Sequence, residues 1–382
     1  MSSVAQLEAR TRAMKVAVVH DWIFVRRGGE RVLEQILNLF PHADLYCLMG
    51  QPQKVLKTFN SHRVFRSFLA SLPWVGRYYK ALLPWLPVAA ESFDLSQYDL
   101  VVSSSSCVAK GVVPPPKALH ACYIHSPMRY AWDQEHVYFP KPPSLKRPVE
   151  LLRRMMLKNL RMWDVCASAR VDMFIANSHF VARRCELFYR RNAVVVHPGV
   201  DLDRFIQRPA SVEREKRVLI FGAWVPYKKM LHALELCIGQ GISVTAAGQG
   251  AELVVAAAKY SKHPLVRIEA NPTDVQVANL YASHKVLLFP ALEDFGIVPL
   301  EAMASGSWVV APRQGGTGET VVDGKTGTLF DLGDDASMLR AVAAALTHQV
   351  NEAELLAHAR SFSQNHFAEN IADQLLTLIE KR

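Results

Sequence analysis

The sequence predicts an α/β protein made of two Rossmann-like domains, each built on a parallel sheet with helices on both faces. At 382 residues the chain is too long for one ordinary hydrophobic core. Short β-branched or apolar runs alternate with helical patterns, which is typical of doubly wound sheets. The alternation stops at a polar stretch near residue 207 and then begins again, so we expect a domain boundary there.

Several buried strands, with helices between them, are expected in the first half. Each is a short apolar run of the kind that is buried on both faces of a parallel sheet. The runs are KVAVVH (15–20), DLVVSSS (99–105), HACYIH (120–125), DMFIANS (172–178) and AVVVHPG (193–199). After the first run, GERVLEQILNLF has the apolar periodicity of a helix.

A polar segment, VDLDRFIQRPASVEREKR, separates this half from a second series of strands. The second series is VLIFGA (218–223), SVTAAGQG (243–250), LVRIEA (265–270), KVLLFPA (285–291) and SWVVAP (307–312). The chain ends in ENIADQLLTLIEKR, which has the pattern of an amphipathic helix. We therefore expect an N-terminal domain over 1–207, a C-terminal domain over 208–362, and a helix over 363–382 that packs back toward the first domain.

The net charge and the cysteine content limit which partners and which cellular compartment are expected. The formal net charge is +9, and two segments, 61–87 and 141–163, mix basic residues with apolar and aromatic ones. Nucleic acid, a membrane surface and phosphorylated substrates all attract such a charge, but the sequence contains no nucleic-acid-binding motif. The six cysteines form no CxxC pair and lie in apolar runs, which indicates a reducing compartment and neither disulfides nor a zinc site. With no signal-peptide pattern and no apolar run of membrane-spanning length, we expect a cytoplasmic protein.

Ligands of open parallel sheets bind at the carboxyl ends of strands, and loops there carry the candidate site residues. Gly28 and Gly29 permit close backbone approach, and the next helix offers free N–H groups to an anion; a plain turn is the alternative. His125 ends a strand and is expected to point into the cleft. Lys228 and Lys229 lie on a turn before a helix, where they suit a phosphate or form a solvated face.

A further loop, PALEDFGIVPLEAMASG (290–306), contains two glutamates, Glu293 and Glu301. Pro299 favours a first helical turn, so Glu301 lies near a helix N-terminus, where a carboxylate is stabilised without any ligand. That does not explain Glu293, which leads from a strand toward the backbone of Gly296. Two carboxylates can accept hydrogen bonds from the vicinal hydroxyls of a sugar or ribose.

Taken in order, these motifs resemble those of the retaining glycosyltransferases of family 4, whose GT-B fold has two Rossmann-like domains facing a central cleft. The matching segments cover nearly the whole chain: HDWIFVRRGGERVLE, ESFDLSQYDLVVSSS, HSPMRYAWD, ARVDMFIANSHFVARR, HPGVDLDRF, WVPYKK, PALEDFGIVPLEAMASG and VVAPRQGGTGETVVDGKTGTLF. They are most similar to bacterial mannosyltransferases of O-antigen (lipopolysaccharide) and exopolysaccharide assembly. The resemblance implies mannose transfer from a nucleotide sugar, GDP-mannose, to a lipid-linked saccharide at the cytosolic face of an anionic membrane.

The resemblance also implies roles for the residues. Glu301 matches the glutamate that holds the nucleotide ribose, and Lys228 matches the lysine on the donor diphosphate, with Lys229 beside it. His125 matches the histidine that contacts the donor sugar near the reacting carbon. Glu293 matches the glutamate on the donor sugar, where it acts together with backbone N–H groups of Phe295, Gly296 and Ile297. Gly28 and Gly29 match the glycine loop that lets donor and acceptor approach.

The chain has no evident DxD motif, so we expect neither a metal ion nor another cofactor. Lys228, helix N-termini and glycine amides then offset the diphosphate charge. The family implies that the leaving phosphate deprotonates the acceptor on the same face of the sugar, so that the anomeric configuration is retained.

One position departs from the family pattern. The family has an arginine a few residues before the lysine, and this chain has Ala223 there, followed by Trp224. The change removes a charge-assisted contact to the departing phosphate. Either Lys229 or Arg313 substitutes, or the enzyme is slow. Two alternatives stay open beside the mannosyltransferase: a relative that uses a UDP-sugar, and a degenerate, non-catalytic nucleotide-sugar binder.

A lipid-linked acceptor would bring the protein to a membrane as a peripheral protein. On a helix, segment 151–163 places Leu152, Met155, Met156, Leu160 and Trp163 on one side and Arg153, Arg154, Lys158 and Arg161 on the other. Either this helix packs on its own core with a solvated basic face, or the basic face lies against anionic lipid together with segment 61–87.

Overall fold

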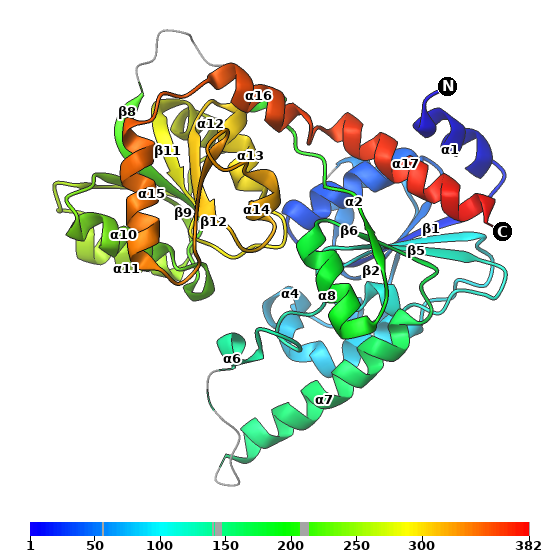
Figure 1. Cartoon of the computed structure of the whole chain (residues 1–382). Coiled ribbons are helices and arrows are strands. Elements are labelled where there is room, and N and C mark those ends of the chain that lie inside the picture. Colours follow the sequence, from blue (N-terminus) through cyan, green and yellow to red (C-terminus); the bar gives the residue numbers. More distant parts are fainter. Residues whose placement is uncertain (56, 140, 142–146, 207–213, 382) are drawn as a thin grey trace. The chain divides into compact units, whose positions relative to one another are not determined.

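The computed structural model describes residues 1–55, 57–139, 141, 147–206 and 214–381. The chain divides into two compact units, one made of Met1–Gly199 with Asn365–Arg382 and the other of Val200–Gln364 (Figure 1). The boundary expected at 207/208 lies outside the described residues. Each unit is built on its own sheet and has its own hydrophobic core.

The first unit is built on a seven-stranded sheet in the order β3-β2-β1-β4-β5-β6-β7. Every neighbouring pair is parallel, and most of the strands are buried along their length, as expected for a sheet covered on both faces. The strands are β1 (Val16–Ile23), β2 (Asp44–Gly50), β3 (Val64–Arg66), β4 (Leu100–Ser105), β5 (Leu119–Ile124), β6 (Met173–Ala176) and β7 (Ala193–Val195).

Helices of very different length cover this sheet. They are α1 (Ser3–Thr11), α2 (Gly28–Leu39), α3 (Pro52–Val55), α4 (Val75–Tyr78), α5 (Leu86–Glu91), α6 (Glu135–Tyr138), α7 (Pro148–Ser168), α8 (His179–Tyr189) and α17 (Gln364–Glu380). The C-terminal α17 belongs to this unit: Phe367 and Leu375 share a buried cluster with Leu33 of α2. Figure 1 shows α17 in red beside α2 and α1.

The second unit repeats the architecture with a six-stranded parallel sheet in the order β10-β9-β8-β11-β12-β13. Its strands are β8 (Glu215–Ala223), β9 (Val244–Gln249), β10 (Val266–Ala270), β11 (His284–Leu288), β12 (Trp308–Pro312) and β13 (Gly327–Phe330). Its helices are α9 (Asp203–Ile206), α10 (Met230–Gly239), α11 (Ala251–Tyr260), α12 (Asp274–Ser283), α13 (Ile297–Ala304), α14 (Thr317–Thr320), α15 (Asp335–Thr347) and α16 (Glu352–Arg360).

The predicted fold class is confirmed, since both halves are doubly wound parallel sheets. Each of the apolar runs predicted as a strand overlaps one, and the first predicted helix corresponds to α2. Three strands were not predicted: β2, β3 and β13. The cysteines are buried as expected apart from Cys166, which is exposed on α7. No helix within the described ranges combines the length and the apolar character needed to cross a membrane.

The packed side of α7 differs from the prediction. Leu157 and Leu160 are buried, but Leu152 and Met155, expected on the packed side with Leu160, are 66% and 58% exposed. Asp164 explains which side of α7 is packed. Its side chain is fully buried and forms an ion pair with the Lys110 ammonium.

Two further bonds fix Asp164, from Trp132 Nε1 at 2.8 Å and from the Tyr189 hydroxyl at 2.8 Å. A buried carboxylate must be satisfied in this way, so it sets the rotation of the helix. The basic residues expected to be free are then engaged: Arg161 donates to Ala131 O at 2.7 Å and pairs with Glu135 at 3.1 Å. Arg153 pairs with Glu150.

Candidate functional site

In the second unit, two of the predicted residues meet where β8 and β11 end. Lys228 closes a 3₁₀ turn, Pro226–Lys228, just after β8, and Glu293 lies between β11 and α13. The Lys228 ammonium lies 2.6 Å from Glu293 Oε1, and the two side chains are 15% and 17% exposed. A cation and a carboxylate therefore stand together, largely sheltered, at the carboxyl edge of the sheet, where ligands of such sheets bind.

The bend after Glu293 is fixed by glycine. Gly296 has φ of +97° and caps α13, and a Cβ there would meet Thr317 Cγ2 at 3.0 Å. Because the first N–H groups of a helix have no acceptor within it, Ile297 at the start of α13 offers a donor next to Glu293. Phe295 is buried in the core and anchors the bend.

A second glycine-rich loop, residues 313–319, packs against this bend; only its Arg313 was named from the sequence, as a substitute for the missing arginine, and not its contact with the bend. Gly316 N donates to Glu293 O at 2.9 Å. A Cβ at Gly316 would come within 2.3 Å of Asp294 O, so the two loops touch backbone to backbone. The sequence signal for this contact was the GGTG run in RQGGTGE.

The loop after β9 is another missed element. A Cβ at Gly248 would lie 2.0 Å from Gly222 O, and one at Gly250 would lie 2.4 Å from Trp224 O. Both positions have positive φ, at +126° and +135°. The ends of β8 and β9 thus approach too closely for any side chain at these two positions, and the signal was the GQG that ends the predicted strand.

Glu301 is buried on α13 and has protein partners. It is 5% exposed; its Oε1 accepts from Arg204 at 3.2 Å and its Oε2 from the Tyr281 hydroxyl at 3.2 Å. These bonds hold the carboxylate in one orientation. Arg204 and Tyr281, which the sequence did not single out, thus position Glu301.

The position of the missing arginine is the end of β8. Ala223 is partly exposed there, whereas Trp224 is fully buried and donates from Nε1 to Ala247 O at 2.8 Å. The indole therefore belongs to the core and does not replace the arginine. Of the two expected substitutes, Arg313 pairs with Asp323 at 3.0 Å, while Lys229 is exposed beside Lys228.

In the first unit, the glycine pair and the histidine lie together. Gly28 and Gly29 open α2, and a Cβ at Gly29 would make ordinary contacts, 3.8 Å from His20 Cε1 and 3.9 Å from His125 Nε2. The Glu30 carboxylate accepts from Arg27 N at 2.8 Å and caps this helix start.

His125 belongs to a chain of hydrogen bonds that the sequence did not reveal. Its Nε2 lies 2.8 Å from Ser104 Oγ, which lies 3.1 Å from His20 Nδ1. Burial lowers the pKa of His125 to about 3, and His20 acts in the same direction. His125 is therefore neutral at physiological pH. The sequence did contain a signal for His20. It ends the predicted strand KVAVVH in the same way that His125 ends the predicted strand HACYIH.

The predicted site residues thus form one group in each unit. The group in the first unit is Gly28, Gly29 and His125; that in the second is Lys228, Lys229, Glu293, Phe295, Gly296, Ile297 and Glu301. Among the described residues, no three His, Cys, Asp or Glu side chains gather in a way that could hold a metal ion.

Family models match both halves of the chain in succession. Residues 26–204 match the model described as Glycosyltransferase Family 4, and residues 202–366 match the model described as Glycosyl transferases group 1. Among curated proteins, the chain is 30% identical over 204 residues to a D-inositol 3-phosphate glycosyltransferase of Streptomyces avermitilis, covering 45% of this chain and 44% of that protein. The chain spans about half the length of the curated relatives it matches.

Solved structures match over nearly the whole chain. Anabaena HepE in complex with UDP and glucose has a TM-score of 0.68 at 18% identity, covering 95% of this chain and 100% of that one. The sucrose-phosphate synthase of Thermosynechococcus elongatus has a TM-score of 0.69 at 16% identity, covering 96% and 100%. These likenesses show a two-domain α/β GT-B fold.

Proposed function

We propose that this chain, whose two halves match the models for Glycosyltransferase Family 4 and Glycosyl transferases group 1, transfers a sugar from a nucleotide-sugar donor to a hydroxyl group of an acceptor. The observation that carries the proposal is the sheltered pair of Lys228 and Glu293 at the carboxyl edge of the second sheet. A donor diphosphate would take the Lys228 ammonium, and the sugar hydroxyls would donate to Glu293.

The loops around the pair supply the remaining contacts. The N–H groups at the start of α13 and in the glycine loops point a positive dipole end toward a diphosphate. Glu301, already oriented by Arg204 and Tyr281, accepts from the ribose hydroxyls. The N–H groups and the Lys228 ammonium are held in place before the nucleotide sugar binds. They therefore stabilise the negative charge that develops on the leaving phosphate.

The proposed chemical step is the one that the resemblance to the retaining family implies. The acceptor oxygen bonds to the anomeric carbon, the bond from that carbon to the phosphate oxygen breaks, and the acceptor proton passes to the departing phosphate. The nucleoside diphosphate leaves, and the new bond forms on the face from which it departed, so the configuration is retained. His125, being neutral, accepts or donates a hydrogen bond without adding charge beside the reacting carbon.

Two donors are candidates. The ordered motifs are most similar to mannosyltransferases, which favours GDP-mannose and a lipid-linked saccharide acceptor in cell-surface polysaccharide assembly. A UDP-sugar is favoured by the fold neighbour HepE, solved with UDP and glucose, and the relatives are named for D-inositol 3-phosphate, a phosphorylated acceptor. We give precedence to GDP-mannose.

Peripheral membrane association is part of the proposal. The surface that we propose for it is the exposed apolar side of α7, and not the basic face that the sequence suggested. Leu152 and Met155 form an exposed apolar stripe on α7 with Met162, and Lys158 on the same helix is exposed. An exposed apolar stripe of this kind can enter the interface of a bilayer, and nearby cations are drawn to anionic lipid.

The donor site is tested by calorimetry with GDP and UDP. Lys228→Ala should weaken binding of the preferred nucleotide at least about tenfold, since a hydrogen bond to a charged group is worth about 1.5–3 kcal/mol. Lys262→Ala, a change of an exposed lysine in the same unit, should leave it intact. Equal binding by both variants and wild type would remove Lys228 from the site.

A further inference from the structure

A second site lies wholly within the first unit, at the carboxyl ends of β1, β2 and β3. It is a cavity of about 720 Å³. Its walls are the segments that follow these three strands: Phe24–Arg26 after β1, Gln51–Val55 after β2, and Ala70–Arg77 after β3. This is the edge of a parallel sheet where ligands bind, and none of the predicted site residues lines the cavity.

The charge of the cavity is one-sided. Arg26, Lys54, Arg66 and Arg77 line it, and among its described lining residues there is no Asp or Glu. Arg26 pairs with Glu34 at 3.0 Å. No carboxylate of the described residues lies within ion-pair distance of Lys54, Arg66 or Arg77. Three cations around one cavity repel one another, and a bound anion removes that cost.

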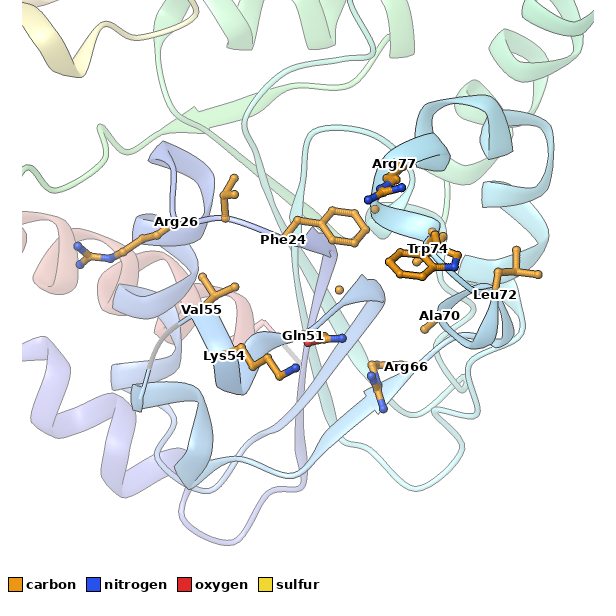
Figure 2. A pocket seen from close by; sticks show the side chains of 14 residues that line it. Phe24, Arg26, Gln51, Lys54, Val55, Arg66, Ala70, Leu72, Trp74 and Arg77 are labelled. Carbon is orange, nitrogen blue, oxygen red and sulfur yellow. The ribbon is translucent and has the colours of Figure 1, made fainter. Parts of the chain in front are cut away.

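An aromatic platform stands among these cations. Trp74 is 73% exposed, and its backbone has φ of +56°, a left-handed conformation that is uncommon for a bulky residue. The Arg77 guanidinium lies 4.8 Å from the centre of its ring. Figure 2 shows Trp74 and Arg77 on one side of the cavity, Lys54 and Arg66 on the other, and Arg26 turned away toward the left edge.

Apolar groups complete the walls. Phe24, Val55, Leu72 and Val75 line the cavity, and Gly76 lies close to the Phe24 ring, where a Cβ would come within 3.3 Å of Cε1. A pocket that joins cations to aromatic and aliphatic walls fits a ligand with an anionic group attached to a ring or a hydrocarbon. A phosphate ester of a sugar or of a hydrocarbon has this chemistry.

We propose that this cavity binds a phosphate or diphosphate group that is joined to an apolar or ring-shaped portion, and that the acceptor substrate is held there by that group. Lys54, Arg66 and Arg77 take the phosphate oxygens, and Trp74 packs against the adjoining portion. That the cavity binds such a phosphate does not depend on the proposed function. Only the statement that this ligand is the acceptor substrate rests on it. A lipid-linked saccharide diphosphate and a soluble sugar phosphate share the chemistry, and the experiment separates them.

The first arm uses inorganic pyrophosphate in a Lys228→Ala background, which removes the diphosphate contact of the donor site. Calorimetry should show that replacing Lys54, Arg66 and Arg77 with Gln weakens pyrophosphate binding at least about tenfold. The matched control replaces Arg10, Arg12 and Lys80, three exposed basic residues of the same unit outside the cavity, with Gln. Equal losses in both triple variants, or no binding by the parent, would overturn the proposal.

The second arm identifies the source of the phosphate. Phosphatidylcholine vesicles carrying polyprenyl diphosphate, the same vesicles carrying phosphatidylglycerol at equal charge, and dissolved glucose 1-phosphate are compared. Preference for polyprenyl diphosphate assigns a lipid-linked acceptor, and preference for glucose 1-phosphate assigns a soluble one. Trp74→Ala should weaken the preferred ligand, whereas Trp85→Ala, equally a change of an exposed tryptophan outside the cavity, should not.

Equal binding to phosphatidylglycerol and polyprenyl diphosphate, insensitive to the cavity variants, would overturn the site in favour of a general attraction to anionic lipid. UDP and GDP binding is measured on the same samples, with Lys228 restored. Cavity variants that keep nucleotide binding show that the donor unit is folded. A wild type that binds pyrophosphate in the cavity but no nucleotide would refute the proposed function and leave the cavity site standing.

Discussion

At the scale of residues, Glu301 combines a structural and a binding role. Its carboxylate is buried and satisfies Arg204 and the Tyr281 hydroxyl, so a helix-start explanation alone is insufficient. Such a group is fixed in one orientation before a ligand arrives. A structural role and a ligand-binding role are therefore compatible, because the bonds that hold the buried carboxylate also fix its orientation.

Glu301→Ala should weaken nucleotide binding and also destabilise the fold, because Arg204 and the Tyr281 hydroxyl each lose one acceptor. Glu301→Gln keeps an acceptor for Tyr281 and separates the two effects. We expect calorimetry with GDP and UDP to show a loss of about 1.5–3 kcal/mol for the Gln variant with a small change in melting temperature. Glu354→Gln, on an exposed part of α16, is the control; unchanged affinity in Glu301→Gln would take Glu301 out of the site.

Ala223 tests the departure from the family pattern. Since Ala223 is partly exposed and Trp224 is held in the core by its bond to Ala247, an arginine at 223 can extend without displacing the indole. Ala223→Arg should therefore raise the steady-state rate by restoring a charge-assisted contact to the departing phosphate. A lower rate with an unchanged melting temperature would show that the site is built around the small side chain.

At the scale of elements, α7 shows where sequence periodicity is insufficient. Its apolar residues are spread around the helix, so a 100° rotation per residue could not decide which stripe is packed. The deciding group is Asp164, whose three partners come from elsewhere in the unit: Lys110, Trp132 and Tyr189. No local sequence pattern predicts such a buried charge. Because Asp164 faces the core, Leu152 and Met155 lie on the exposed side of the helix.

The exposed stripe of α7 should carry membrane binding. Leu152→Glu with Met155→Glu should reduce co-sedimentation with phosphatidylglycerol vesicles at low salt, because the apolar contact is lost and two negative charges are added. Leu187→Glu, on α8 of the same unit and also exposed, is the matched control. If the double variant sediments as wild type does, or if neutral and anionic vesicles bind equally, this surface does not meet the membrane.

The strands also show where a prediction from sequence pattern is incomplete. The strands that the sequence predicted are continuous apolar runs, the pattern of strands buried on both faces. Two of the missed strands lack it: β3 has only three residues, Val64–Arg66, and β13 is the short GTLF. The third, β2, has the sequence DLYCLMG and is buried along its whole length, so it was missed although it has the pattern. The missed β2 and β3 form the edge that carries the basic cavity, so the sequence indicated the basic segment 61–87 but not the cavity that it lines.

At the scale of the whole molecule, the sequence predicted the two Rossmann-like halves that the structure shows, because the apolar runs and the motifs that follow them alternate in order along the chain. The roles of the site residues stay predictions. The sequence did not reveal what positions these residues: His20 and Ser104 behind His125, Arg204 and Tyr281 behind Glu301, and the glycine loops that touch backbone to backbone. These partners are far apart in the chain and carry no motif of their own. The formal charge of +9 finds a partial explanation in the cavity of the first unit.

The most direct test of the central claim is turnover of a nucleotide sugar by the purified protein. GDP-mannose, UDP-glucose and UDP-N-acetylglucosamine are supplied in turn, and release of the nucleoside diphosphate is followed for wild type, Glu293→Gln and the control Glu354→Gln. We expect one donor to be consumed, with a rate that falls about 100-fold in Glu293→Gln and is unchanged in the control. A protein that binds nucleotide yet consumes none of the donors, or a Glu293→Gln variant as fast as wild type, would contradict the account.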